Sequence, residues 1–240
     1  MKTIKIAHLY YDLMNLNGEN GNVLCLKEHF KQQKAKVEVD LLTVDDKINF
    51  NNYDIFYIGS GSKENMKIVL NDLNKYQENI KKAIDDNKYF IVTGNALGLF
   101  GEHIIDLDNK KQKCLNIFKY YLKEIDIEEC IVGDQLYKTS LIEENIIGFQ
   151  NRQTIMINNE NSLFTVIEGT GYKKDSNEEG YKYNNFYGTY LLGPLLVRNP
   201  YFTDYLVKKI LKENNLPYKT NHSSFDYIAY NEFINNKNRI

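Results

Sequence analysis

The first hundred residues alternate between two patterns of hydrophobic and polar positions. Short apolar runs at residues 3–9, 53–58 and 89–93 predict strands, and residues 36–44 alternate strictly enough to predict another. Between these runs, apolar residues recur three or four positions apart, which is typical of a buried helix face. The residues with this spacing are Val23, Leu26 and Phe30, and then Met66, Val69, Leu70, Leu73, Tyr76, Ile80 and Ile84 in one continuous stripe.

Strands and helices that alternate in this way form a parallel sheet with right-handed crossovers. We therefore predict an α/β fold, a three-layer sandwich with a mostly parallel central sheet of the flavodoxin-like kind. Ligands of such sheets bind beyond the carboxyl ends of the strands. Three loops are expected there, at residues 10–21, 59–62 and 94–98. Ser62 is placed to cap the following helix, and the third loop is predicted to run into a short helix.

The second half of the chain is more irregular and richer in strand-like segments. A helix is predicted after Asn199-Pro200, and a short helical tail is predicted within residues 216–240. No stretch rich in Pro, Gly or Ser divides the chain, so we expect one domain over residues 1–240. The candidate strands of this half lie near residues 115–122, 130–137, 146–149, 163–167 and 186–192.

Charge and composition narrow the classes of function. The chain has 30 Lys and Arg against 32 Asp and Glu, a formal net charge of -2, which disfavours a nucleic-acid-binding surface. No segment approaches the roughly 20 apolar residues of a membrane span, and the N-terminus lacks a signal-peptide core, so we expect a cytoplasmic protein. Three cysteines without Cys-x-x-Cys spacing suggest neither a disulfide framework nor a zinc site, and no cofactor is expected.

Three segments far apart in the chain carry a more specific pattern. They are residues 16–22 after the first strand, residues 53–62 with the sharp turn Gly59-Ser60-Gly61, and residues 188–194 near the end. In this order they resemble the CobB/CobQ-like class I glutamine amidotransferases, and among them the GatD subunits of lipid II isoglutaminyl synthase. The resemblance covers about residues 4–210, nearly the whole chain.

This resemblance implies a glutaminase that passes ammonia to a partner enzyme. For the GatD subunits the implied partner is MurT, a Mur-ligase-like protein, in a heterodimer that amidates the D-glutamate of the peptidoglycan stem peptide. The implied ligand is glutamine or a glutamine-like small molecule.

The side chains that glutamine hydrolysis needs are missing. Acyl transfer requires a thiolate nucleophile, a base to activate it and donors for the oxyanion. The resemblance implies a Cys at the turn after the fourth strand, where Gly94 stands, and a His just before Gly-Pro, where Leu192 stands. Thr93 is the one hydroxyl at that turn, and it lacks the base that a threonine nucleophile needs. We therefore predict no catalytic residues, only vestigial positions.

Parts of the pocket are predicted to survive. The turn Gly59-Ser60-Gly61 can present backbone N–H groups without side chains, and Asn95 follows the vestigial nucleophile position. Glu19 matches an acidic pocket residue, and Cys130 stands where the resemblance implies an Arg that holds glutamine. The glycines can instead serve only to let a strand meet a helix, so both readings stay open.

The leading hypothesis is a catalytically degenerate amidotransferase-like subunit that docks on a MurT-like ligase. The alternative is an active amidotransferase or other small-molecule enzyme with a non-standard site, built on Glu19, Asp12, Asp134 or Tyr190. A third reading is a generic flavodoxin-like binding domain, which the separation of the matching segments disfavours.

Overall fold

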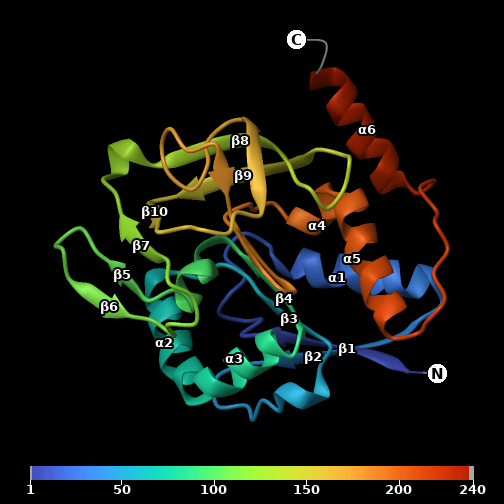
Figure 1. Ribbon diagram of the computed structural model, residues 1–240, viewed down its shortest axis with the longest axis horizontal. Coiled ribbons are helices and arrows are strands. Elements are labelled where there is room, and N and C mark those ends of the chain that lie inside the picture. Colours follow the sequence, from blue (N-terminus) through green and yellow to red (C-terminus); the bar gives the residue numbers. More distant parts are fainter. Residues whose placement is uncertain (1, 238–240) are drawn as a thin grey trace.

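The computed structural model of the protein describes residues 2–237 (Figure 1). At its centre lies a six-stranded sheet in the order β13-β14-β4-β3-β1-β2. Neighbouring strands from β14 to β2 are parallel, and β13 pairs antiparallel with β14 at the edge. The strands are β1 (Thr3–Leu9), β2 (Lys36–Leu42), β3 (Ile55–Ile58), β4 (Tyr89–Thr93), β13 (Tyr181–Tyr183) and β14 (Phe186–Thr189).

Helices cover both faces of this sheet, because successive side chains of a strand point to opposite faces. Ile4 and Ile6 of β1 pack with α1 (Asn20–Gln32) and α5 (Pro200–Glu213). Ala7 and Leu9 belong to the other core layer, together with α2 (Lys63–Leu73) and α3 (Gln77–Asp85). The predicted three-layer α/β sandwich with a mostly parallel central sheet is confirmed.

The local details of the helices differ in one place from the sequence prediction. Ser62 caps α2 as expected, since its side chain accepts the Asn65 N–H at 3.1 Å. The single predicted stripe up to Ile84, however, is divided into α2 and α3 by a 3₁₀ turn at Asn74–Tyr76, where Asn74 is a poor helix former. The short helix predicted after β4 is a 3₁₀ helix, Gly94–Phe100.

The second half of the chain builds two further sheets of four strands, in the orders β10-β7-β5-β6 and β12-β11-β8-β9. In Figure 1, β5 and β6 lie at the left, and β8 and β9 lie above the central strands. The first small sheet packs into the core layer of α2 and α3, and the second into the layer of α1 and α5. The predicted strand at 115–122 was wrong except at its end, because the backbone N–H groups of residues 115–117 bond to carbonyls of residues 99–101 instead of to a strand. The strands are β5 (His103–Ile105), β6 (Lys111–Lys113), β7 (Tyr121–Glu124), β8 (Ile131–Lys138), β9 (Ile146–Arg152), β10 (Thr154–Ile157), β11 (Phe164–Glu168) and β12 (Glu178–Glu179).

Two helices complete the C-terminal part, α4 (Leu195–Arg198) and α6 (Phe225–Lys237). The predicted tail therefore contains a helix, while its last residues, 238–240, lie outside the described part of the chain. Tyr230 of α6 is buried and donates to the Asn145 carbonyl at 2.6 Å. Asp226 lies 3.2 Å from His29 of α1. That one domain spans residues 1–240 stays a prediction.

Candidate functional site

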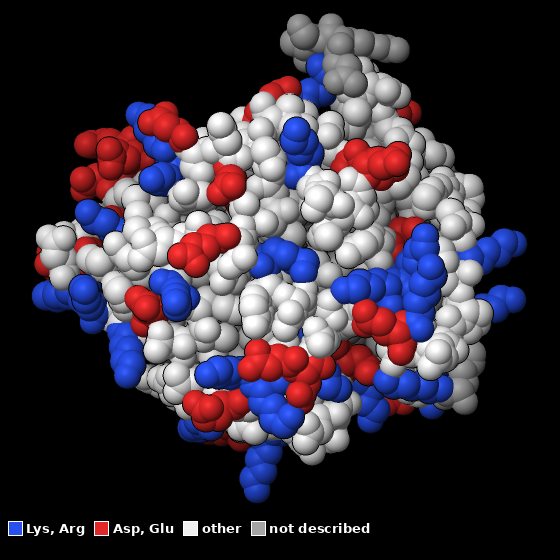
Figure 2. All heavy atoms as spheres, viewed as in Figure 1, with Lys and Arg blue, Asp and Glu red and all other residues white. Residues whose placement is uncertain are grey.

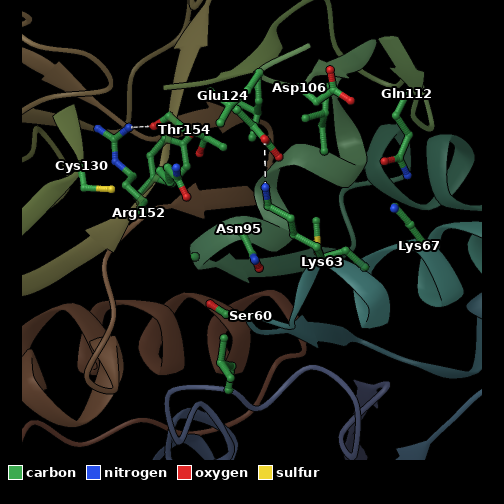
Figure 3. Close-up of a pocket in the computed structure, with 18 of the residues that line it drawn as sticks. Ser60, Lys63, Lys67, Asn95, Asp106, Gln112, Glu124, Cys130, Arg152 and Thr154 are labelled. Atoms are coloured by element: carbon green, nitrogen blue, oxygen red, sulfur yellow. Dashed lines mark hydrogen bonds and ion pairs between the residues drawn. The ribbon is translucent and has the colours of Figure 1, made fainter. Parts of the chain in front are cut away.

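The loops that follow β1, β3 and β4 meet at one end of the central sheet, beside a cavity of about 1160 Å³ (Figure 3). The end of β4, the start of α2 and the two small sheets all contribute residues to its walls. The loops predicted to matter are therefore brought together. Of the predicted site residues, the cavity is lined by Ser60, Gly94, Asn95, Cys130 and Leu192, whereas Gly59, Gly61 and Glu19 are not among the lining residues.

Gly94 has the backbone conformation of a nucleophile elbow. It follows the last residue of β4 directly and has φ +64°, in the left-handed region that favours glycine. A chain of buried hydrogen bonds stabilises this turn. Asn22 of α1 donates to the Tyr57 hydroxyl at 2.7 Å, and that hydroxyl lies 2.8 Å from the Thr93 hydroxyl. The hydroxyl of Thr93 is thus engaged in the core, away from any reacting group.

The side chains of Ser60 and Leu192 converge on Gly94. A Cβ atom at residue 94 would lie 1.8 Å from Ser60 Oγ, 3.1 Å from Ser60 Cβ and 3.0 Å from Leu192 Cδ2. Leu192 reaches this place because its N–H bonds to the Phe149 carbonyl at 2.8 Å, which fixes the chain beyond β14. The two positions at which the resemblance implies nucleophile and base therefore face each other, and Ser60 fills the space that any side chain at residue 94 would need.

Gly94→Ala is expected to destabilise the fold by about 2–3 kcal/mol, because the positive φ and the collision with Ser60 both oppose a Cβ atom. In a Ser60→Gly background the same substitution is expected to cost only about 1–2 kcal/mol, the part due to φ. Urea unfolding of the four proteins of this double-mutant cycle measures the difference. An equal cost of Gly94→Ala in both backgrounds would contradict the packing of Ser60 against residue 94.

The backbone N–H groups of Ser60 and Gly61 are bonded to side chains of the same chain. The Ser60 N–H donates to Glu19 Oε1 at 3.0 Å, and the Gly61 N–H donates to Asn95 Oδ1 at 3.1 Å. Asn95 Nδ2 returns a bond to the Gly61 carbonyl at 2.7 Å. The sequence left open whether these N–H groups serve a ligand or only a tight turn, and in the structure both bond to side chains of the chain itself. An oxyanion would have to displace Glu19 and Asn95 to reach them.

Glu19 lies behind the turn and is almost fully buried. Its second carboxylate oxygen accepts the Asn17 N–H at 2.7 Å, so both oxygens hold loop backbone. Gly59 must be a glycine here, since a Cβ atom would lie 2.6 Å from Glu19 Cβ and 2.7 Å from the Met14 carbonyl oxygen. Glu19 therefore stabilises the loop through these hydrogen bonds and does not line the cavity.

Cys130 is the one cysteine of the chain that lines the cavity, and neither the other two cysteines nor any histidine lines it. Burial raises the pKa of the Cys25 and Cys114 thiols to about 12, so neither forms a thiolate near neutral pH, and neither lines the cavity. Burial lowers the pKa of His8 to about 4, which keeps its ring neutral at the end of β1. None of the four histidines of the chain (His8, His29, His103 and His222) lines the cavity.

The acidic residues of the alternative reading are also outside the cavity. Asp12 binds the Thr43 hydroxyl at 2.8 Å, and Asp134 lies within β8. Within residues 2–237, no group of three or more His, Cys, Asp or Glu side chains could hold a metal ion. Of the four residues proposed for a non-standard site, Tyr190 is the one that lines the cavity.

Sequence reasoning missed the charged wall around Arg152. The β8–β9 register pairs Arg152 with Ile131, so an arginine stands next to Cys130, the position at which the resemblance implies one. Figure 3 shows Arg152, Cys130 and Thr154 together on one wall, and the Lys63–Glu124 ion pair, 2.9 Å long, on another. In the sequence Arg152 is an isolated arginine beyond the strand predicted near residues 146–149, and the β8–β9 register is needed to place it beside the cavity.

Most of the chain matches a known protein family. A model of the CobB/CobQ-like glutamine amidotransferase domain matches residues 5–200. The chain belongs to this family. The expected resemblance is therefore confirmed, and the match extends from β1 to the start of α5.

Two curated relatives in this family carry the same name. The GatD subunit of lipid II isoglutaminyl synthase (glutamine-hydrolyzing) from Streptococcus pneumoniae is 30% identical over 212 residues, which cover 88% of this chain and 81% of that protein. The subunit of the same name from Staphylococcus aureus is 28% identical over 219 residues, covering 91% of this chain and 89% of that protein.

Solved structures of glutamine amidotransferases share the fold. One crystal structure of a glutamine amidotransferase, 11% identical, covers 88% of this chain and 99% of that chain with a TM-score of 0.53. The glutaminase domain of Trypanosoma brucei CTPS with bound acivicin, 7% identical, covers 90% and 96% with a TM-score of 0.54. At these identities the likeness concerns the fold alone.

Within this family, the chain has glycine and leucine at the two positions where the resemblance implies nucleophile and base. No helix among residues 2–237 is both long and apolar enough to cross a membrane.

Proposed function

We propose that this chain is an amidotransferase-like subunit without glutaminase chemistry, which supports a Mur-ligase-like partner of the MurT type in the amidation of lipid II in the cytoplasm. The observation that carries the proposal is the elbow, where Gly94, Ser60 and Leu192 pack together in place of a thiol and an imidazole. Losing either member of a nucleophile–base pair typically lowers the rate by several orders of magnitude.

Retention of the fold supports a role that depends on the protein's surface and not on its chemistry. The relatives from Streptococcus pneumoniae and Staphylococcus aureus are both named as subunits of an amidating enzyme. A subunit that stabilises or positions its partner needs an intact fold, and it does not need a reactive thiol. In that role the partner would draw ammonia from a source other than glutamine hydrolysed by this chain.

Co-expression with a MurT-like ligase of the same organism tests this proposal. We expect the two proteins to copurify as a 1:1 complex, and the complex to amidate lipid II with ammonium but not with glutamine as the nitrogen source. The ligase purified alone is the control for stabilisation. Failure to form a complex would overturn the subunit role, and amidation driven by glutamine would overturn the loss of chemistry.

A further inference from the structure

Two Asn-Gly dipeptides lie close together after β1, one in the loop and one at the start of α1. They are Asn17-Gly18 and Asn20-Gly21, the only two in the chain. Asparagine before glycine is the dipeptide most prone to spontaneous loss of its side-chain amide, because glycine has no Cβ atom to hinder the approach of its backbone nitrogen to the asparagine side chain. The fold therefore decides which of the two dipeptides can react.

Asn17 and Gly18 are exposed and loosely held. Gly18 has φ +76°, and a Cβ atom there would meet no other atom within 4 Å. Its N–H donates to the Asn15 carbonyl at 3.4 Å, longer than the roughly 3.2 Å limit of an ordinary N–H···O bond. The Asn17 amide is held no more tightly, since its Nδ2 lies 3.4 Å from Glu19 Oε1. The two groups that must meet can therefore rearrange easily.

Asn20 and Gly21, in contrast, are already part of α1. The Gly21 N–H donates to the Gly18 carbonyl at 3.1 Å, and the Asn20 N–H donates to Asn15 Oδ1 at 2.9 Å. A Cβ atom at Gly21 would lie 2.7 Å from Pro194 Cγ, so this backbone is packed closely against Pro194. Helical geometry directs each N–H along the helix axis and away from the preceding side chain. The second dipeptide is therefore protected by the fold.

We infer that Asn17 is a site of spontaneous deamidation in the folded chain. The backbone nitrogen of Gly18 attacks Cγ of Asn17 and forms a C–N bond. The Cγ–Nδ2 bond breaks, and the side-chain nitrogen leaves as ammonia with the proton of the Gly18 amide. Water, the one co-reactant, then opens the resulting succinimide at either carbonyl carbon, which gives aspartate or isoaspartate at residue 17. The inference is independent of the proposed function, because the reaction needs neither glutamine nor a partner.

The modification places a negative charge against Glu19. The Asn17 N–H donates to Glu19 Oε2 at 2.7 Å, and the other oxygen of this buried side chain accepts the Ser60 N–H at 3.0 Å. A carboxylate at residue 17 repels Glu19 where the Asn17 amide donated to it, and isoaspartate also lengthens the backbone by one carbon atom. We expect both products to weaken the hydrogen bonds of Glu19 and to loosen the turn at Ser60.

Incubation of the full chain at pH 8, followed by digestion and mass spectrometry, tests the inference. We expect acid to accumulate at residue 17 at least about tenfold faster than at residue 20, because reaction at Asn20 must first break the helix hydrogen bonds of Gly21. In concentrated urea the two rates should become similar, since the fold no longer protects Asn20. Equal rates in the folded chain, faster reaction at residue 20, or no acid at residue 17 would each overturn the inference.

The consequence at Glu19 is tested with variants of residue 17. Asn17→Asp is expected to lower the melting temperature by about 2–4 °C, the value of one lost hydrogen bond in a chain of this size, and to speed hydrogen exchange of the Ser60 N–H. Asn17→Gln closes the corresponding ring far more slowly, so its melting temperature should stay constant during the incubation. Asn51→Asp is the matched control, the same change at an exposed asparagine outside this loop. An effect of Asn17→Asp no larger than that of Asn51→Asp would overturn the predicted repulsion.

Discussion

The double variant Gly94→Cys/Leu192→His is expected to hydrolyse glutamine barely above background, whereas the triple variant that adds Ser60→Gly is expected to be about a hundredfold faster than the double. A side chain at residue 94 must occupy the space of Ser60 Oγ, 1.8 Å away, and Ser60 Cβ also lies only 3.1 Å away. A nucleophile displaced by about 1 Å can lose a hundredfold in rate. Removing the serine side chain relieves both contacts.

Glutamate released from glutamine, measured with a coupled dehydrogenase, gives the rates. Ser60→Gly/Gly94→Cys, which lacks the restored imidazole, is the control that separates relief of the collision from restoration of the base. Even the triple variant should remain slow, because the backbone N–H groups of residues 60 and 61 are still bonded to Glu19 and Asn95. A double variant as active as the triple would show that Ser60 moves aside freely, contrary to the packing described here.

Glu179 is expected to make the fold less stable as the pH rises from about 5 to about 7. Its carboxyl group is fully buried beside the end of β14, where it accepts bonds from the Thr189 hydroxyl and the Tyr190 N–H, both at 2.7 Å. Burial raises its pKa from 4.5 to about 7, against the opposing effect of those bonds and of Arg152. The folded chain therefore holds this proton more tightly than the unfolded chain does.

The sign of the pH effect follows from that difference. Between pH 4.5 and 7 the folded state binds more protons, so the free energy of unfolding falls with rising pH, by about 3 kcal/mol over the window. His8 acts in the opposite direction, because its pKa is lowered from 6.5 to about 4 and its stabilising effect is lost as the pH falls. Only a comparison of variants separates the two groups.

Urea unfolding of the native chain and of Glu179→Gln at pH 5 and pH 8 makes that comparison. The neutral amide cannot titrate, so the variant should gain about 3 kcal/mol relative to the native chain between the two pH values. The contribution of His8 is common to both proteins and cancels. The same pH slope in both proteins would contradict a raised pKa for Glu179.

The sequence was sufficient for the part of the fold that rests on local periodicity. The apolar runs of β1, β3 and β4, the cap at Ser62 and the crossovers of a parallel sheet are all encoded within short windows. The two small sheets could not be predicted in this way, because their strands are short and pair with segments far away in the sequence. Ile131 with Arg152, and Leu122 with Met156, are pairs that no local pattern specifies.

In the candidate site, too, some features could be predicted from the sequence and others required the structure. Gly94 and Leu192 could be singled out from the sequence because the resemblance assigns their positions, and the structure brings them together as expected. Two other features depend on side-chain positions, which a sequence pattern does not contain. They are the collision of a Cβ atom at residue 94 with Ser60, and the hydrogen bonds of Glu19 and Asn95 to the N–H groups of the turn. Arg152 was overlooked because its role arises only when β9 and β10 close one wall of the cavity.

Glutamate release from glutamine by the native chain, alone and in complex with a MurT-like ligase, tests the central claim most directly. The account predicts a rate equal to that of a no-protein control in both cases, since the elbow carries neither thiol nor imidazole. Release that saturates with glutamine, and that is abolished by a change at the cavity wall such as Tyr190→Phe, would contradict it.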